Sequence, residues 1–372
     1  MIITHLELRN FRTYEKLSIK LGKNMNIFIG DNAQGKTNIL ESIVVLSLTK
    51  SFRDGIEENL IKFGREKAFI SGKIRNESVI HDLKVTISKK EKELFIDNHS
   101  ITKFADYISN LAIILFTPDD LEIVKGTPSL RRNLLNMELS QLSAIYLKTY
   151  NEYNKLLKTR NEYLKILYLN SIADKSYLDV LTDKLISKAV TIYQMRNEYL
   201  NKINNYLKDI YQKITSLSNL KIIYLPNIDL GSYTDEEITN AMKRVFKVNF
   251  KKELAQGMTL YGPHRDDFVF FLDEKDLKLY GSEGQKRLAF IAYKLSTIPI
   301  FKEKLHTDPV LLLDDIFSEI DKKKQNKLLQ YIMKGSQCII TTTSLNGIQK
   351  KYLEDAKIFK VQHGVVSVES GE

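Results

Sequence analysis

The spacing of apolar residues predicts a strand-rich region at the start of the chain. Apolar and polar residues alternate over residues 2–8 and again at Leu17, Ile19 and Leu21, as expected for two half-buried strands. Further short apolar runs, each typical of a strand, occupy residues 26–29, 68–74, 83–87, 93–96 and 111–116. Residues 38–46 instead carry apolar side chains at helical spacing, which predicts a helix directly after the run at 26–29.

A long helical region follows. From Arg131 to about Ser216 the chain contains neither Pro nor Gly, the longest stretch without either residue. One series of regularly spaced residues is Tyr146, Tyr150, Tyr153, Leu157, Leu164 and Leu167, with Arg160 in the same register, and a second is Leu178, Leu181, Leu185, Ile192, Met195, Tyr199 and Tyr206. The break at residues 170–176 separates two helices of about thirty residues each, which predicts an antiparallel helical hairpin. The lysines opposite the first series (Lys148, Lys155, Lys158 and Lys165) form either a solvated face or one that faces DNA.

Strands and helices alternate again in the last part of the chain. The pattern predicts strands at residues 220–225, 258–261, 268–272, 309–313 and 338–341, a helix at 236–246, and another helix that begins near Lys286. Alternating elements at both ends of the chain predict an α/β fold, into which the helical hairpin is inserted.

Composition adds the class of protein and a class of partner. Of 372 residues, 43% are hydrophobic and 27% charged, the balance of a soluble globular protein. Lys and Arg number 56 against 46 Asp and Glu, a net charge of +10. That excess favours a polyanionic partner, nucleic acid first and an acidic membrane surface second, although a basic surface without a partner is the alternative.

The single cysteine and the short apolar runs exclude other classes. Cys338 allows no intrachain disulfide and no cysteine-based zinc site, and its apolar surroundings predict a packed core thiol. No apolar run is long enough to span a bilayer, and the N-terminus shows no signal pattern, so we expect a cytoplasmic protein with no membrane partner.

The clearest chemistry is a phosphate-binding loop. Residues Gly30, Asp31, Asn32, Ala33, Gln34, Gly35, Lys36 and Thr37 match the pattern G-x-x-x-x-G-K-T, between a predicted strand and a predicted helix. Backbone N–H groups and the helix N-terminus would hold the phosphates of ATP. Lys36 would reach the β- and γ-phosphates, and Thr37 would ligate Mg²⁺. The alternative is a glycine-bearing turn that binds nothing.

A second motif complements this loop. Pro309-Val310-Leu311-Leu312-Leu313-Asp314-Asp315 is an apolar run that ends in two carboxylates, typical of a central parallel strand that opens on a nucleotide. Asp314 would help to hold Mg²⁺, and Asp315 would polarise the attacking water. With Lys36, these are the predicted catalytic residues.

Other candidate site residues have a purely structural interpretation as well as a functional one. Ser282-Glu283-Gly284-Gln285 is a capping box before a helix, but Ser282, Gly284 and Gln285 would also suit a second contact with a γ-phosphate. Arg12 would lean over the nucleotide or be a solvated turn arginine. His264 with Asp266 suggests a metal or acid–base pair, which a hydrogen-bonded tight turn explains equally well.

The order of these motifs resembles the ABC-type ATPases and, within them, the SMC-like heads. The P-loop, S-x-G-Q, the strand ending in Asp-Asp, and Ser318-Glu319-Ile320-Asp321 carry that resemblance. Leu6-Glu7-Leu8-Arg9-Asn10-Phe11-Arg12, Phe116-Thr117-Pro118-Asp119-Asp120-Leu121 and Gly262-Pro263-His264-Arg265-Asp266-Asp267 look like the RecF family of bacterial recombination and repair proteins. The match covers the whole chain.

The resemblance implies an ATPase head of two lobes with an inserted helical hairpin. The N-terminal lobe would be residues 1–128, the hairpin 129–216 and the C-terminal lobe 217–372, with 217–255 left open. It also implies an ATP-dependent homodimer, in which the signature segment of one copy caps the nucleotide of the other. Implied partners are double-stranded and gapped DNA, RecR and RecO, with which such proteins load RecA onto single strands.

Departures from the wider ABC pattern imply a weak, DNA-stimulated ATPase that acts as a switch. Glu283 stands where transporters carry Gly, and Thr342-Thr343-Ser344 contains no switch histidine. Asp119 or Asp120 would replace the usual glutamine. The rival hypotheses are a transporter-associated ATPase, which would need that histidine and an exposed apolar groove, and a non-enzymatic tether that uses the hairpin as an arm.

Overall fold

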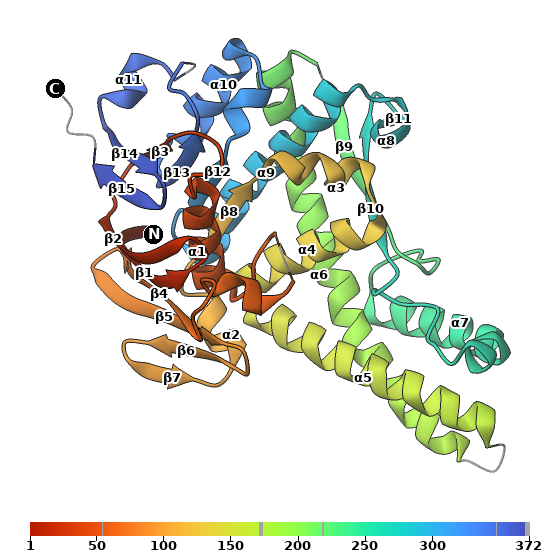
Figure 1. The fold of residues 1–372 in the computed structure, drawn as a ribbon. Helices are drawn as coiled ribbons and strands as arrows, with labels where there is room; N and C mark the ends of the chain where they lie inside the picture. The colour runs from red at the N-terminus through yellow and green to blue at the C-terminus, as the bar shows by residue number, and fades with distance from the viewer. Residues whose placement is uncertain (54, 171–173, 218, 347, 369–372) are drawn as a thin grey trace. The chain divides into compact units, whose positions relative to one another are not determined.

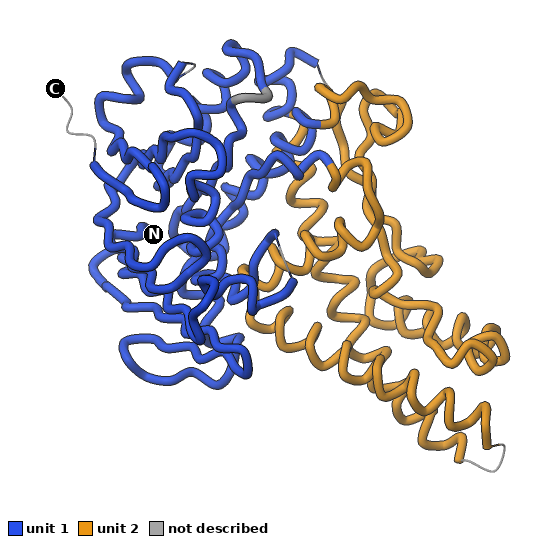
Figure 2. The backbone as a smooth tube through the Cα atoms, viewed as in Figure 1, with its two compact units in different colours: residues 1–121, 209–217, 287–372 blue, residues 122–208, 218–286 orange. Residues whose placement is uncertain are grey.

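The computed structural model describes residues 1–53, 55–170, 174–217, 219–346 and 348–368, without the side chains of 318 and 319. These residues form two compact units (Figure 2). Unit 1 comprises residues 1–121, 209–217 and 287–372, and unit 2 comprises residues 122–208 and 218–286. The domain boundaries after residues 128 and 216 stay predictions. Residues 171–173 of the predicted hairpin break and the side chains of Ser318 and Glu319 lie outside the described part.

Unit 1 contains a six-stranded, mainly parallel sheet in the order β15-β14-β3-β13-β12-β8 (Figure 1). Its strands are β3 (Met25–Ile29), β8 (Ile113–Phe116), β12 (Val310–Asp314), β13 (Cys338–Thr342), β14 (Ala356–Gln362) and β15 (Val365–Val368). Strands β14, β3, β13, β12 and β8 run parallel, so their carboxyl ends meet at one edge of the sheet. Strands β8, β12 and β13 are buried throughout, because a parallel sheet is covered on both faces.

A second six-stranded sheet in unit 1 is antiparallel, in the order β2-β1-β4-β5-β6-β7. Its strands are β1 (Ile2–Phe11), β2 (Tyr14–Lys20), β4 (Lys67–Asn76), β5 (Val79–Ser88), β6 (Lys92–Ile96) and β7 (His99–Ile101). Helix α1 (Lys36–Leu48) contacts both sheets and is buried almost all round. One core cluster therefore joins the two sheets through α1.

Unit 1 also contains most of helix α9 (Glu283–Leu305), the last residues of α6 (Lys175–Thr215), and several further elements, which are short apart from α10. They are η1 (Glu57–Leu60), α2 (Phe104–Ile108), η2 (Pro118–Asp120), η3 (Ile316–Glu319), α10 (Lys322–Ile332) and α11 (Lys350–Leu353). Cys338 is fully buried in β13, and burial raises the pKa of its thiol to about 12, which confirms the predicted core thiol.

Unit 2 is mostly helical. It contains α3 (Leu121–Lys125), α4 (Pro128–Leu142), α5 (Ala144–Leu169), β9 (Leu220–Leu225), α7 (Asp235–Gln256), β10 (Asp267–Leu272), β11 (Lys275–Asp276) and α8 (Leu277–Tyr280), and most of α6 (Lys175–Thr215). Helices α5 and α6 are the predicted hairpin helices, but they span 26 and 41 residues rather than thirty each. Helix α4 is an additional element, and α9 (Glu283–Leu305) begins near the predicted position. No helix of the described residues is long and apolar enough to cross a membrane.

The second predicted series of packed residues, which lies on α6, is wrong toward the C-terminal end of the helix. Tyr206 is exposed, while Ile203 and Leu207 are buried. Met195 is only half-buried, and its neighbour Arg196 is buried in its place. A straight helix has 3.6 residues per turn, so a series read on seven-residue steps drifts away from the buried face over a helix of this length.

The strand predicted at residues 258–261 is also wrong. Residues 258–261 form no strand, because their backbone groups bond to side chains instead of a neighbouring strand. The Thr259 N–H donates to Asn161 Oδ1 at 2.7 Å, and the Leu260 N–H donates to Glu253 Oε1 at 2.8 Å. The spacing of apolar residues cannot show whether the backbone bonds to side chains or to a neighbouring β-strand.

Candidate nucleotide-binding site

The P-loop connects β3 to α1, and its two glycines are required by close contacts. Gly35 caps α1 with φ 103°, a conformation that other residues rarely adopt. A Cβ atom on Gly35 would lie 2.9 Å from Thr13 Oγ1, and one on Gly30 would lie 2.2 Å from the Val361 carbonyl oxygen. The loop can therefore approach the turn between β1 and β2 and strand β14 only with glycine at both positions.

Lys36 folds back over the loop. Its ammonium donates to the carbonyl oxygens of Gly30 and Asp31, both at 2.7 Å. Burial lowers the pKa of Lys36, and the carboxylates of Asp315 and Asp314 oppose that shift. A cation is thus held at the centre of the loop, where it can exchange these carbonyls for phosphate oxygens.

Strand β12 brings a carboxylate to the start of α1. The Thr37 hydroxyl donates to Asp314 Oδ1 at 2.9 Å, and the Thr341 hydroxyl donates to the same oxygen at 2.6 Å. Hydroxyl and carboxylate oxygens are the ligands that Mg²⁺ prefers. Thr37 and Asp314, 277 residues apart in the chain, therefore form a donor set that fits this ion.

Asp315 leaves the end of β12 in the left-handed conformation, with φ 45°. Its backbone N–H donates to Thr341 Oγ1 at 3.1 Å, which fixes the residue at the same edge of the sheet. The structure thus brings together the loop, Lys36, Thr37, Asp314 and Asp315.

The segments that follow the neighbouring strands β8 and β13 also carry polar side chains. After β8, the carboxylate of Asp120 accepts from the backbone N–H of Thr117 at 2.9 Å, and Asp119 is exposed. After β13, the Thr342 hydroxyl donates to the Ser344 carbonyl oxygen at 2.9 Å. Which of the two aspartates replaces the usual glutamine stays a prediction.

Arg12 binds a residue that the sequence patterns did not indicate. Its guanidinium donates to both carboxylate oxygens of Glu41, at 2.9 and 2.7 Å, and Glu41 is fully buried in α1. Ser51 Oγ donates to Glu41 Oε1 at 2.6 Å. The only carboxylate of α1, which stands between the apolar residues Leu40 and Ile43, is the signal that could have revealed this pair, since a buried carboxylate needs a partner. The role of Arg12 at the nucleotide stays a prediction.

The predicted signature segment, residues 282–285, lies in unit 2. The Ser282 N–H donates to Gln285 Oε1 at 2.8 Å, and the Gln285 N–H donates to Ser282 Oγ at 3.3 Å, which confirms the capping box. A Cβ on Gly284 would meet nothing within 4 Å. The first turn of α9 is therefore open at Gly284, and its role at a γ-phosphate stays a prediction.

Comparison with known proteins decides the family. A family model described as "RecF/RecN/SMC N terminal domain" matches residues 2–367. Two proteins named "DNA replication and repair protein RecF" are each 38% identical to the chain: that of Geobacillus sp. (strain WCH70) over 99% of both chains, and that of Pediococcus pentosaceus over 98% of both. The chain belongs to the RecF family.

Solved structures agree with this family and confirm the predicted fold class. A structure described as "Structure of the recombination mediator protein RecF-ATP in RecFOR pathway" is 29% identical with a TM-score of 0.91, over 99% of this chain and 97% of that one. An Smc head bound to a domain of ScpA is 16% identical with a TM-score of 0.57, over 100% of this chain and 98% of that one, and shares the fold alone. The family resemblance and the ABC-type ATPase head are thus both confirmed.

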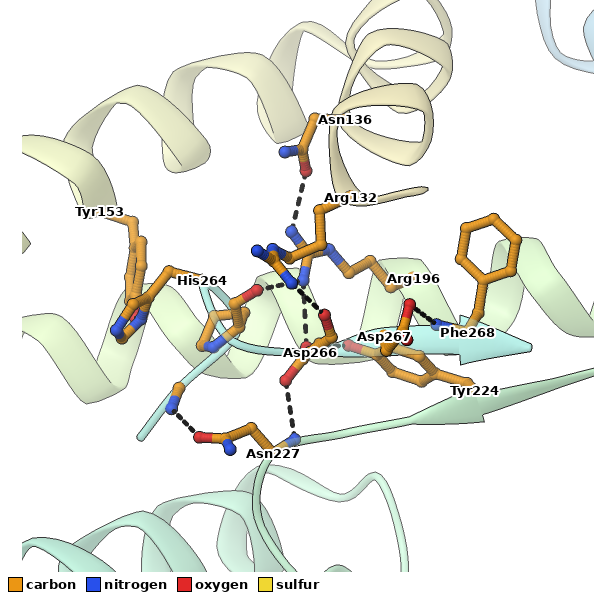
Figure 3. A network of polar contacts seen from close by, with 12 residues as sticks. Arg132, Asn136, Tyr153, Arg196, Tyr224, Asn227, His264, Asp266, Asp267 and Phe268 are labelled. Atoms are coloured by element: carbon orange, nitrogen blue, oxygen red, sulfur yellow. Dashed lines mark hydrogen bonds and ion pairs between the residues drawn. The ribbon is translucent and has the colours of Figure 1, made fainter. Parts of the chain in front are cut away.

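In this RecF-family chain, arginine side chains hold the segment from Gly262 to Asp267, and Figure 3 shows two of them, Arg132 and Arg196. Arg196 donates to Asp266 Oδ2 at 3.0 Å, and Arg132 donates to the Asp266 carbonyl oxygen at 2.7 Å. Arg131 donates to both carboxylate oxygens of Asp267, at 2.6 and 2.9 Å. Tyr224 also donates to Asp266, so the carboxylate is buried but fully engaged.

His264 is a structural residue of the same segment. Its Nδ1 lies 2.7 Å from the Tyr153 hydroxyl, and its Nε2 lies 3.1 Å from the Thr259 carbonyl oxygen. Because a carbonyl only accepts, Nε2 carries the proton and Nδ1 accepts from Tyr153. Burial lowers the pKa of His264 to about 4, so the ring is neutral at pH 7. No group of three or more His, Cys, Asp or Glu residues that could hold a metal ion occurs among the described residues, so the tight-turn interpretation fits better than the metal one.

Proposed function

We propose that this chain is an ATP-dependent, DNA-binding recombination mediator whose bound nucleotide joins two copies. The observation that carries the proposal is the hydrogen bond of 2.9 Å between Thr37 at the P-loop and Asp314 at the end of β12. These two groups suit Mg–ATP, and Lys36 lies in the same loop. The solved RecF structure described as RecF-ATP supports the same ligand.

Each residue of the site has a role in this proposal. Backbone N–H groups of residues 30–37 bind the phosphates, Lys36 contacts the β- and γ-phosphates, and Arg12 leans toward the nucleotide. Thr37 and Asp314 would hold Mg²⁺, which neutralises phosphate charge when bound. Asp315 orients and polarises the water that attacks the γ-phosphate.

Dimerisation would follow from the triphosphate itself. The N-terminus of α9 in one copy offers Ser282, Gly284 and Gln285 to the γ-phosphate bound by the other copy. After hydrolysis that contact is lost, so the copies separate. Because no histidine occurs at residues 342–344, we expect slow hydrolysis that acts as a switch and that DNA stimulates.

Lys36→Met tests the nucleotide site. The variant should lose measurable ATP binding by isothermal titration calorimetry, because an uncharged side chain cannot neutralise the phosphates. Lys23→Met removes an exposed lysine from the same unit and should bind ATP like the wild type. Normal ATP affinity of the Lys36→Met protein would contradict the site.

DNA is the proposed polyanionic partner, in double-stranded and gapped form, with RecR and RecO as protein partners and the cytoplasm as location. The net charge of +10 supports an electrostatic DNA site. The logarithm of the DNA affinity should then fall linearly with the logarithm of the salt concentration, because bound cations leave the DNA. An affinity for gapped DNA that salt does not change would contradict this part.

We also propose that the chain is divided into an N-terminal lobe (residues 1–128), a helical hairpin domain (129–216) and a C-terminal lobe (217–372).

A further inference from the structure

An open cavity of about 450 Å³ lies in unit 2, beside the C-terminal end of α7. It is lined by Asn227, Lys252, Gln256, Met258, Leu260, Tyr261 and Arg265. Two of these residues are cations, and none is a carboxylate. The volume lies in the range of ordinary ligand sites.

The polar groups of the cavity are mainly hydrogen-bond donors. The Gly262 N–H donates to Asn227 Oδ1 at 3.3 Å, and no acceptor for Asn227 Nδ2 occurs among the described residues. Within the same part of the chain, neither Lys252 nor Arg265 has an ion pair. The guanidinium of Arg265 contacts only the sulfur of Met258, at 3.7 Å. The cavity therefore offers unused donors to a ligand.

The carboxylates that stand next to these cations in the chain are already paired. Glu253, which follows Lys252, is buried and accepts from an arginine of α5 at 2.8 Å. Asp266, which follows Arg265, is buried and accepts from an arginine of α6 at 3.0 Å. The cavity thus keeps its positive charge, and an anion is the ligand that would neutralise it.

The backbone that carries Arg265 is fixed on both sides, although its side chain is exposed. The Arg265 N–H donates to the Gly262 carbonyl oxygen at 2.9 Å. The ring of His264 is hydrogen-bonded at both nitrogens, and Asp266 accepts from the Asn227 N–H at 2.8 Å (Figure 3). A cation on a fixed backbone loses less conformational freedom when it binds a ligand.

Further lysines extend the positive surface along α7. Lys247 and Lys251 are exposed and one turn apart, and Lys251 precedes Lys252 of the cavity. After its first turn, α7 contains a single carboxylate, the buried Glu253. Lysines near a helix C-terminus are common, because they oppose the helix dipole. Here they continue a cavity that also contains Arg265, so the charged surface fits a chain of phosphates better than one small anion.

We propose that this cavity binds a backbone phosphate of DNA through Arg265 and Lys252. The inference rests on the proposed DNA-binding function and adds a site of contact in unit 2. A guanidinium can donate two parallel hydrogen bonds to two phosphate oxygens, and an ammonium adds a point charge. Asn227 Nδ2 is a third donor. Contacts of this kind position the DNA without reading its sequence.

Neutral variants of the two cations test the site. Arg265→Gln and Lys252→Gln should each weaken the binding of a fluorescent DNA duplex about 10- to 100-fold, the usual effect of losing a charged hydrogen bond. In fluorescence anisotropy across a salt series, the slope of log affinity against log salt should become smaller in magnitude by about 1. The loss should be equal for two duplexes of different sequence, because no base is read.

Three controls accompany these variants. Lys275→Gln, at an exposed position of β11 in the same unit, should bind both duplexes like the wild type. Arg265→Lys should keep the wild-type salt slope but bind more weakly, because an ammonium cannot replace the planar fork. Since the changed side chains are exposed, every variant should keep the wild-type midpoint of urea denaturation.

Unchanged affinity and slope in Arg265→Gln would overturn the proposal. A loss that depends on the sequence of the duplex, an equal loss in Lys275→Gln, or a loss explained by a lower urea midpoint would also overturn it. Normal DNA affinity with the loss of a second bound ATP in calorimetry would assign the cavity to a free nucleotide instead. If the wild type binds no duplex at any salt concentration, the proposed DNA-binding function itself fails, which is a different result.

Discussion

Asp315 shows how one backbone conformation fixes the position of a candidate catalytic residue. The residue follows a fully buried strand and turns at φ 45°, with its N–H bonded to Thr341. A left-handed conformation at a non-glycine residue is costly and persists where the surroundings fix it, often at functional sites.

Asp315→Asn should therefore leave ATP binding and dimerisation intact but slow hydrolysis at least about 100-fold, the usual effect of losing a general base. Phosphate release under saturating ATP measures this effect. Asp106→Asn, an exposed residue of α2, serves as the control. Rapid hydrolysis by the Asp315→Asn protein would remove Asp315 from the mechanism.

His264 gives a prediction about pH. Its pKa is about 4 in the folded chain and 6.5 in the unfolded chain, so the unfolded chain binds the extra proton between these values. The contribution to the free energy of unfolding is complete above pH 6.5 and is lost as the pH falls to about 4, by at most about 3 kcal/mol.

His264→Gln should remove this part of the pH dependence, because an amide can make both hydrogen bonds without titrating. Urea denaturation at pH 7 and pH 4.5 measures it. His99→Gln, at an exposed position of β7, should keep the wild-type dependence. If the free energy of unfolding fell equally between pH 7 and pH 4.5 in the wild type and in His264→Gln, His264 would not be neutral in the folded chain.

The residues of the candidate nucleotide site that could be predicted are those with a local signal. Lys36 and Thr37 belong to one continuous motif, and Asp314 ends one apolar strand. Glu41 carried only the indirect signal of a carboxylate among buried residues, and Arg196 carried none. Their partners Arg12 and Asp266 are 29 and 70 residues away and pair with them only through the fold.

At the scale of elements, Arg160 joins three helices. It donates to Thr182 of α6 at 2.9 Å and to Glu253 of α7 at 2.8 Å, and its guanidinium lies 4.5 Å from the centre of the Phe246 ring. The regular spacing along α5 predicted that Arg160 lies in register with the packed residues of this helix. It did not predict which residues Arg160 contacts. Both Arg160 and Glu253 are buried, so this ion pair has no access to water.

Arg160→Met should lower the free energy of unfolding by about 3–5 kcal/mol, because it leaves the Glu253 carboxylate buried without its partner. Denaturation followed by circular dichroism measures the change. Lys158→Met, on the exposed face of the same helix, should change stability by less than about 0.5 kcal/mol. Equal stability of the two variants would mean that the pair does not hold the helices together.

Elements with a strong period were easier to predict than elements defined by their neighbours. The P-loop helix and the strands beside it follow from apolar spacing, and β9 has the predicted bounds. The prediction for 258–261 failed because side chains satisfy its backbone: Asn161, 98 residues from Thr259, and Glu253 of α7, seven residues from Leu260. Strands β14 and β15 were not predicted, although β14 extends the parallel sheet beside β3.

At the scale of the whole molecule, the proposal requires two copies. Ser282→Arg should keep wild-type ATP affinity but remain monomeric with ATP, because a bulky cation at the start of α9 blocks the γ-phosphate contact. Ser232→Arg, at an exposed site in the same unit, should still dimerise. A dimer of Ser282→Arg in light scattering would contradict the role of the signature segment.

The central claim is that a bound triphosphate joins two copies of the chain. Sedimentation velocity of the wild type with a non-hydrolysable ATP analogue, with ADP and with no nucleotide tests it most directly. We predict a dimer with the analogue and a monomer in the other two samples. The same sedimentation coefficient in all three samples would contradict the claim.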